Sequence, residues 1–203
     1  SIGLALLLNN AIRFSGLYRS LIFQTWVVPW IVIAILWGWI FNTDYGLVNG
    51  TLAQYGLIEK QIDWLFTGRY AQWAIILCFA WRSIPFLMVI MLAALQGVSS
   101  EVLDAAEVDG ARYWQKTFKV TLPLIQNISL AAALMQGVRM FQEMTLPFVL
   151  TEGGPMNSTM VLSMYSYNLA FDSWDFALAA TVGSLWLVML VLFGAFYLKT
   201  VVL

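Results

Sequence analysis

Three ionisable residues, Arg82, Arg139 and Glu143, lie inside long apolar stretches of the sequence. Charged side chains at membrane depth are costly, and they normally face the interior of a helix bundle or an aqueous path. Gln136, Arg139 and Glu143 recur at helical spacing, with Gln142 beside them, so they predict one polar face on a helix. This face indicates either contact with a transported solute or an internal ion-pair network that fixes helix register, with Arg82 pairing with Glu143.

The chain offers little for catalysis or metal binding. It has 203 residues, no histidine and a single cysteine, Cys78, whose apolar neighbours indicate a small buried hydrophobic residue. Histidine-based triads, histidine metal sites and intrachain disulfides are therefore excluded. A net charge of -1 excludes the basic surface that nucleic-acid binding requires. We predict no catalytic residue, no metal and no nucleic-acid partner.

The composition places the chain in a membrane. Hydrophobic residues make up 61% and charged residues only 10%, far from the roughly 25% charged of soluble proteins. A membrane helix needs about 20 apolar residues, because only a helix satisfies its own backbone groups in hydrocarbon. Four segments qualify: 21–41, 70–98, 124–150 and 176–198. Residues 1–8 are interpreted as the end of a truncated helix. We predict an all-α, polytopic membrane helix bundle with about five spans, forming a single domain over 1–203.

Basic residues in the short connections predict the orientation of this bundle, because Lys and Arg resist transfer across the membrane. One side carries Arg13, Arg19, Arg112, Lys116, Lys119 and Lys199, whereas the other carries Lys60 and Arg69. We therefore expect the connection 98–123 to be cytoplasmic. The connections 42–69 and 151–175 are expected to be extracytoplasmic.

Trp26, Trp30 and Trp37 lie within about 40° of one another on a helical wheel. Aromatic faces accommodate the C–H surfaces of sugar rings, which makes Trp30 a candidate residue of a transport path. Tryptophan is also a common interfacial anchor and packing residue, and that interpretation remains open. Pro29 predicts a kink in the same segment.

The cytoplasmic connection has a pattern typical of helix, turn and helix. Ser100 can cap the first helix, acidic residues in its first turn suit the helix dipole, and Asp109-Gly110 supplies the stop. The second helix is predicted over 111–120. A first helix of about nine residues is marginal in water unless something packs on it.

The surface of that first helix indicates what would pack there. Ala105 and Ala106 have almost no side chain, so another protein can approach the backbone closely. Asp104, Glu107 and Val108 share one helix face and offer charge to a basic partner. The alternative is a solvated connecting hairpin, and these residues alone leave both interpretations open.

Three blocks of the sequence resemble a known family. Asp104-Ala-Ala-x-x-Asp109-Gly110-Ala, followed by Phe118-x-x-Thr121-Leu122-Pro123, resembles the "EAA" loop of permease subunits of ABC importers. The block Leu150-Thr-x-Gly153-Gly154-Pro155, with Ser158-Thr159 and Tyr165-x-Tyr167 after it, resembles the signature of the carbohydrate-uptake branch. The third block comprises Gly46-Leu-Val-Asn49-x-x-Leu52, Trp64-Leu65 and Trp81-Arg82-x-x-Pro85-Phe86. The blocks occur in the order that the family shows.

The resemblance implies a transmembrane permease subunit of an ATP-driven importer in the bacterial cytoplasmic (inner) membrane, forming half of the translocation path for a carbohydrate or related solute. It implies four partners besides the lipid bilayer: a second, different permease, two ATPase subunits and an extracytoplasmic solute-binding protein. ATP and Mg are hydrolysed by the ATPase subunits, so this chain is expected to bind no cofactor and to be no enzyme. An N-terminal part of the family's chain is expected to be missing.

The resemblance also assigns residues. The ATPase-docking surface would consist of Asp104, which replaces the family's usual Glu, together with Ala105, Ala106, Glu107, Asp109 and Gly110. The candidates for the translocation path are Arg82, Gln136, Arg139, Gln142, Glu143 and Trp30. The alternative function is a secondary transporter or channel that uses the intramembrane Arg/Glu set, although such a protein has no need of a docking hairpin. An intramembrane hydrolase is disfavoured because no Lys or Asp lies in any span.

Overall fold

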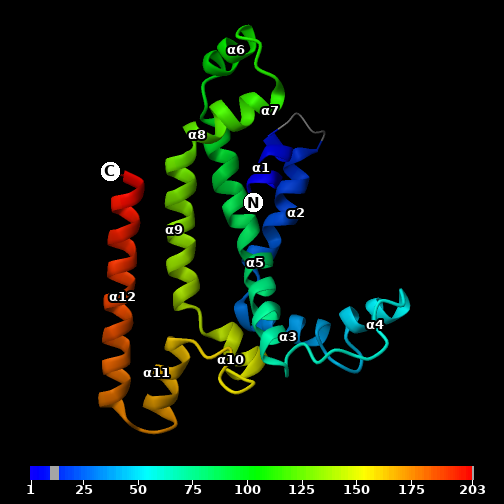
Figure 1. The fold of residues 1–203 in the computed structure, drawn as a ribbon, viewed down its shortest axis with the longest axis vertical. Coiled ribbons are helices and arrows are strands. Elements are labelled where there is room, and N and C mark those ends of the chain that lie inside the picture. Colours follow the sequence, from blue (N-terminus) through cyan, green and yellow to red (C-terminus); the bar gives the residue numbers. More distant parts are fainter. Residues whose placement is uncertain (10–13, 203) are drawn as a thin grey trace. The chain divides into compact units, whose positions relative to one another are not determined.

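The computed structural model describes residues 1–9 and 14–202, which form helices joined by short connections (Figure 1). No strand occurs among these residues, so the predicted all-α fold is confirmed for this part of the chain. Arg13, which contributed to the predicted orientation, lies outside the described residues. The chain divides into two compact units: Ser1–Val27, Arg82–Val138 and Gly194–Leu203 form the first, and Val28–Trp81 and Arg139–Phe193 form the second.

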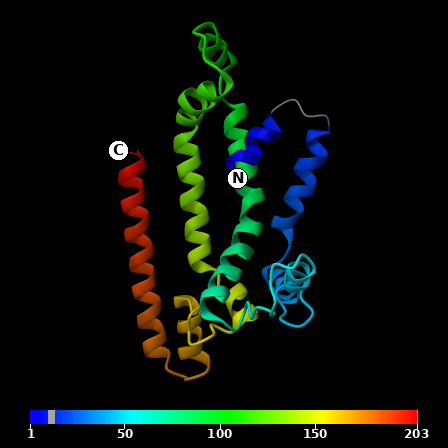
Figure 2. The same cartoon turned by 45° about the vertical axis from the view of Figure 1, so that its right-hand side comes forward.

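Two helices agree closely with predicted spans. Helix α5 (Gly68–Gln96) has 29 residues and α12 (Phe176–Val202) has 27, and each is one uninterrupted helix (Figure 2). The predicted segments were 70–98 and 176–198. Both helices are long and apolar enough to cross a membrane. Long apolar runs form continuous helices because the backbone then satisfies its own hydrogen bonds.

The other two predicted spans are interrupted. Segment 21–41 is divided between α2 (Ser15–Val27) and α3 (Trp30–Ile40), because Pro29 has an extended backbone with ψ of 145°. Segment 124–150 is divided between α9 (Gln126–Gln142) and α10 (Thr145–Thr151). Within the described ranges, two helices can span a membrane alone. The number rises to four if α2 with α3, and Tyr113–Leu124 with α9, each count as one broken span.

The break between α2 and α3 shows that the prediction of one helix face shared by three tryptophans was wrong. Trp26 lies on α2, whereas Trp30 and Trp37 lie on α3, so the three residues do not share one helical wheel. Trp26 stacks on Phe86 with ring centroids 5.1 Å apart. The helical pattern was therefore wrong at Pro29, where the chain leaves the α-helical conformation.

The first unit is built around apolar side chains of α1 (Ile2–Asn9), α5 and α9. Its core comprises Ala5, Leu8, Met88, Met91, Leu92, Ala94, Leu95, Ile125 and Ala132. Alanines from different helices allow their backbones to approach closely, which stabilises helix packing within membranes. The Ser129 hydroxyl lies 3.1 Å from the Met91 sulfur, so even the polar side chain on this face has a partner.

The second unit contains α3, α4 (Leu47–Gln54), α10 and α11 (Leu162–Phe171). Helices α3 and α10 pack on each other. The core comprises Ile33, Ala34, Phe41, Ala74, Ile75, Cys78, Leu146 and Leu150. Cys78 is fully buried, as its apolar neighbours predict.

Candidate functional site

The connection between α5 and α9 contains four short helical elements. They are α6 (Ser100–Val108), α7 (Tyr113–Lys116), the π-helical segment η1 (Thr117–Thr121) and α8 (Leu122–Leu124). They lie beyond the end of α5 and the start of α9 in both views (Figures 1 and 2). The predicted second helix over 111–120 is therefore only partly correct. The Leu122 N–H donates to the Thr117 carbonyl five residues earlier, which is the backbone bond of a π turn. The Thr117 and Thr121 hydroxyls donate to the carbonyls of Tyr113 and Lys116.

Both ends of α6 have local caps. The N-cap is Ser99, whose hydroxyl accepts the Glu101 N–H at 3.3 Å, so the prediction of Ser100 was wrong by one residue. At the other end Gly110 has φ of +80°, a left-handed conformation that suits glycine. The N–H groups of Gly110 and Ala111 donate to the carbonyls of Glu107 and Ala106, both at 2.9 Å. This pair of bonds is a Schellman motif, so the predicted stop at Asp109-Gly110 is confirmed.

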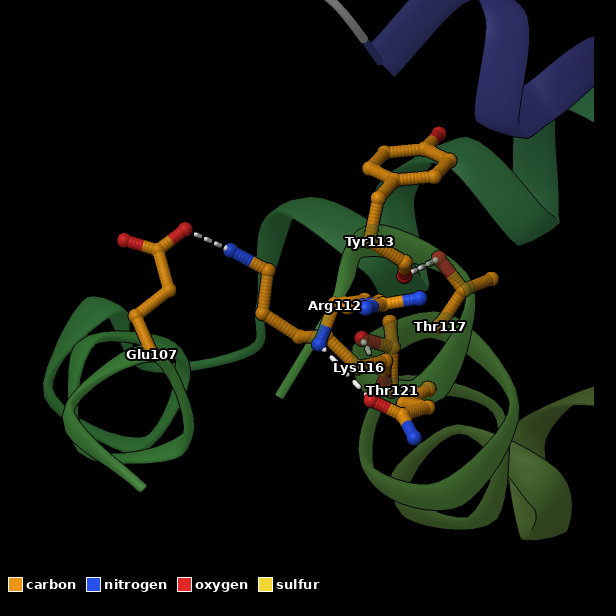
Figure 3. A network of polar contacts seen from close by, with 7 residues as sticks. Glu107, Arg112, Tyr113, Lys116, Thr117 and Thr121 are labelled. Carbon is orange, nitrogen blue, oxygen red and sulfur yellow. Dashed lines mark hydrogen bonds and ion pairs between the residues drawn. The ribbon is translucent and has the colours of Figure 1, made fainter. Parts of the chain in front are cut away.

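Side chains connect α6 to α7. Glu107 and Lys116 form an ion pair (Figure 3). The Arg112 N–H donates to the side-chain oxygen of Gln115 at 2.9 Å, which satisfies a donor at the start of α7. The Glu107 side chain is 60% exposed, and exposed ion pairs contribute only about 0.2–1 kcal/mol. The ion pair between α6 and α7 therefore stabilises the hairpin only weakly.

Most of the predicted docking surface is exposed. Asp104, Ala105, Asp109 and Gly110 are exposed, Ala106 is half-buried, and Glu107 contacts Lys116. Sequence reasoning missed an aromatic set beside this surface, formed by Tyr113, Trp114 and Phe118, which are all exposed. Trp114 and Phe118 stack with centroids 5.9 Å apart, and their i, i+4 spacing was the signal that could have identified them.

The residues predicted to form a polar face on α9 differ in their burial. Gln136 is buried, and its amide nitrogen donates to the Ser83 hydroxyl at 2.7 Å. Arg139 and Gln142 are exposed. Ser83 was missed by sequence reasoning, although a polar residue beside Arg82 in an apolar span was a visible signal. Gln136 therefore connects α9 to α5.

Glu143 lies one residue beyond the end of α9, so it is not on the predicted helical face. Its carboxylate accepts the Thr145 N–H at 2.8 Å, a bond that satisfies a donor at the start of α10. Arg82 belongs to the first unit and Glu143 to the second, so their pairing remains a prediction. Trp30 packs edge-on against Phe79 with centroids 5.1 Å apart, which agrees with the packing interpretation of this residue.

The connection between α3 and α5 is organised by a buried amide. Asn49 is 2% exposed, and its nitrogen donates to the carbonyls of Thr43 at 3.0 Å and Ile62 at 2.9 Å. Its oxygen accepts from the Ile62 N–H and from the Trp64 indole at 2.9 Å. All four hydrogen-bonding positions of the amide are used. The third sequence block therefore contains a residue that fixes the conformation of this connection.

Comparisons with known proteins give concordant results. The model of the family described as "Binding-protein-dependent transport system inner membrane component" matches residues 1–198. The chain is 30% identical over 195 residues to the trehalose/maltose transport system permease protein MalF of Thermococcus litoralis, covering 96% of this chain and 65% of that protein. It is 37% identical over 183 residues to the lactose transport system permease protein LacF of Rhizobium radiobacter, covering 88% and 61% respectively. The chain thus spans less than two thirds of the length of these relatives.

Solved structures show the same fold at lower identity. A chain from the crystal structure of a bacterial alginate ABC transporter in complex with alginate pentasaccharide-bound periplasmic protein has a TM-score of 0.83 and 21% identity, covering 97% of this chain and 68% of that chain. A chain from the crystal structure of a bacterial ABC transporter involved in alginate import has a TM-score of 0.80 and 20% identity, covering 98% and 71%.

Proposed function

The chain belongs to the family of inner-membrane components of binding-protein-dependent transport systems, and we propose that it forms half of the translocation path of an ATP-driven importer in the bacterial cytoplasmic membrane. We propose a carbohydrate or a related solute as the substrate. Relatives with 30% and 37% identity are named for the transport of trehalose, maltose and lactose, which supports this substrate class. The chain performs no bond chemistry in this proposal.

The proposed partners are a second permease of different sequence, two cytoplasmic ATPase subunits and an extracytoplasmic solute-binding protein. Few spanning helices occur in the described ranges, so a path enclosed by helices needs a second subunit. The α6–α8 connection supports the ATPase contact, because its exposed apolar groups, Val108 and Trp114 among them, are more than a solvated hairpin requires. A binding protein is part of the description of the family itself.

The exposed face of α6 is the main observation that supports this proposed function. Asp104, Ala105, Asp109 and Gly110 would sit on an ATPase subunit, while the Glu107–Lys116 pair keeps α6 attached to α7. ATP-driven closure of the ATPase subunits would displace α6, and the attached helices α5 and α9 would move with it. A ligand can shift a conformational equilibrium only through interactions that differ between the two states. The docked α6 surface supplies such an interaction.

Within the membrane we propose different roles for the polar residues. Arg139 and Gln142 are exposed on an apolar helix, and charged side chains at membrane depth normally face an aqueous path or the interior of a helix bundle. These two residues, with Arg82 and Glu143 as further candidates, would line the path. Gln136 would instead fix α9 against α5 through Ser83, and Trp30 would pack against Phe79.

Replacing Ala105 with phenylalanine tests the docking proposal. Ala105 is exposed, so the larger side chain leaves the contacts of α6 unchanged but prevents close approach of a partner. The matched control is Ala53→Phe, at an exposed position of α4. In a co-purification of the tagged permease with its ATPase subunits, Ala105→Phe should lose the ATPase subunits and Ala53→Phe should retain them. Wild-type retention and unchanged ATP hydrolysis by the Ala105→Phe complex would contradict the proposal.

A further inference from the structure

A groove in the first unit combines one arginine with apolar walls. A cavity of about 370 Å³ lies between α2 and α5. Arg19, Ser20 and Phe23 of α2 line one wall, and Leu92 and Gln96 of α5 line the other. Polar groups therefore gather at one end of an otherwise apolar cavity.

A second cavity, of about 630 Å³, adjoins this groove on α5. It shares Val89 and Ala93 with the first cavity and extends to Leu124 and Ile128. Val89, Leu124 and Ile128 are among the exposed large hydrophobic residues. The two adjoining cavities thus share apolar residues of α5, and Arg19 lines only the first of them.

Arg19 has donors that the described residues do not satisfy. One terminal nitrogen of its guanidinium donates to the Leu8 carbonyl at 3.2 Å. The Nε atom is buried and has no hydrogen-bond partner among the described residues, and Arg19 forms no ion pair with any carboxylate in them. A guanidinium offers five N–H donors, and a cation against apolar walls is costly without an anion. The polar end of the groove therefore lacks a negative charge.

The position of the groove indicates where that charge comes from. Arg19 lies about one turn from the start of α2, and Gln96 is the last residue of α5. The α6–α8 connection follows directly, so this end of the groove is cytoplasmic in the orientation on which the proposed function rests. Lipid phosphates lie at this depth, and the cytoplasmic leaflet carries the anionic lipids.

We propose that the groove binds one anionic phospholipid. Arg19 holds the phosphate, Ser20 and Gln96 supply further hydrogen bonds, and an acyl chain lies along Val89, Ala93 and Ile128. A purely apolar groove would suit a neighbouring helix equally well. The arginine at its end, which has no counter-ion among residues 1–9 and 14–202, favours a lipid, whose phosphate and acyl chain match both parts of the groove.

Lipid retention by the intact importer tests this site. The complex is reconstituted in nanodiscs of equal parts phosphatidylglycerol and phosphatidylcholine and then extracted with mild detergent. Native mass spectrometry then counts the phosphatidylglycerol that stays bound. Arg19→Gln should reduce retained phosphatidylglycerol about five-fold, the effect of one basic residue near an anionic membrane surface. Arg19→Lys should restore most of it. The exposed Arg69→Gln, at the opposite end of α5, is the matched control and should retain the lipid.

A second variant tests the apolar part of the groove without touching Arg19. Ala93 is exposed and lines both cavities, so Ala93→Trp should fill the groove and also release the lipid. Excess inorganic phosphate should displace nothing, since it has no acyl chain. Displacement by phosphate, wild-type retention in both Arg19→Gln and Ala93→Trp, or a cross-link that places a protein helix in the groove would each overturn the proposal. Because retention is measured without transport, failure of the importer function would leave this result unaffected.

Discussion

Two connections of this chain are stabilised by different kinds of interaction, one buried and one exposed. The connection between α3 and α5 closes around the buried amide of Asn49, which makes four hydrogen bonds within it. The α6–α8 connection is held at its surface, by the exposed Glu107–Lys116 pair and the glycine cap of α6. A connection with a buried polar centre fixes its own conformation. One held by an exposed ion pair and a glycine cap is held more weakly.

Large apolar residues are exposed on both connections, so exposure alone does not separate them. Val108 is 88% exposed and Trp114 is 62% exposed on the α6–α8 connection, and Phe66 is 78% exposed on the connection between α3 and α5. A nine-residue helix is marginal in isolation. The hairpin therefore has the surface and the instability expected of a segment that completes its packing on another protein.

The largest predicted loss of stability is for substitution of Asn49, the buried amide of the connection between α3 and α5. Asn49→Ala leaves the Trp64 indole and the carbonyls of Thr43 and Ile62 without partners, which should cost about 2–4 kcal/mol. Thermal unfolding of the purified permease should show a lower Tm, with faster proteolysis within 42–67. Gln54→Ala, at an exposed position of α4, is the control. An unchanged Tm would remove the contrast between the two connections.

The second prediction concerns Gly110. Its φ of +80° is strained for any residue with a Cβ, although a Cβ would have open space around it. Gly110→Val should therefore destabilise the end of α6 by about 1–2 kcal/mol, and Gly110→Asn by less, because asparagine tolerates this conformation. Amide hydrogen exchange at Gly110 and Ala111 measures the effect. Equal exchange in both variants would show that the backbone conformation is not the cause.

The third prediction separates packing from transport in the membrane. Ser83→Ala should cost about 1 kcal/mol, because it leaves the buried amide of Gln136 without its partner. The double variant Ser83→Ala with Gln136→Leu should recover most of that stability, as measured by denaturation in mixed micelles. If the double variant is stable but loses transport, Gln136 belongs to the path after all.

The smallest effect is expected for the surface ion pair. Glu107→Gln should destabilise the hairpin by about 0.2–1 kcal/mol, and the difference from wild type should decrease as salt is added. Hydrogen exchange over 100–116 at low and high salt measures both. A salt-independent loss larger than that of Gly110→Val would mean that the hairpin is not weakly held.

The sequence predicted the features that depend on local composition. The apolar runs gave α5 and α12 to within a few residues, and Asp109-Gly110 gave the end of α6. Such features follow from backbone hydrogen bonding in an apolar medium and from the conformational freedom of glycine. The interruption at Pro29 was only predicted as a kink, so the three tryptophans were wrongly placed on one wheel.

Features that depend on packing between distant segments could not be predicted in the same way. Ser83 and Gln136 are 53 positions apart, and their hydrogen bond requires the alignment of α5 against α9. The partners of Asn49 come from Thr43, Ile62 and Trp64, which a local pattern does not bring together. A polar residue in an apolar span indicates only that some partner exists.

Hydrogen–deuterium exchange of α6 is the decisive measurement for docking of the α6–α8 connection on an ATPase subunit. Amides of 100–110 are compared between the isolated permease and the complex with its ATPase subunits, with 42–67 as the internal reference. We predict fast exchange of 100–110 in the isolated permease, strong protection in the complex, and no change in 42–67. Equal exchange of 100–110 in both samples would contradict the claim that this hairpin completes its structure on an ATPase subunit.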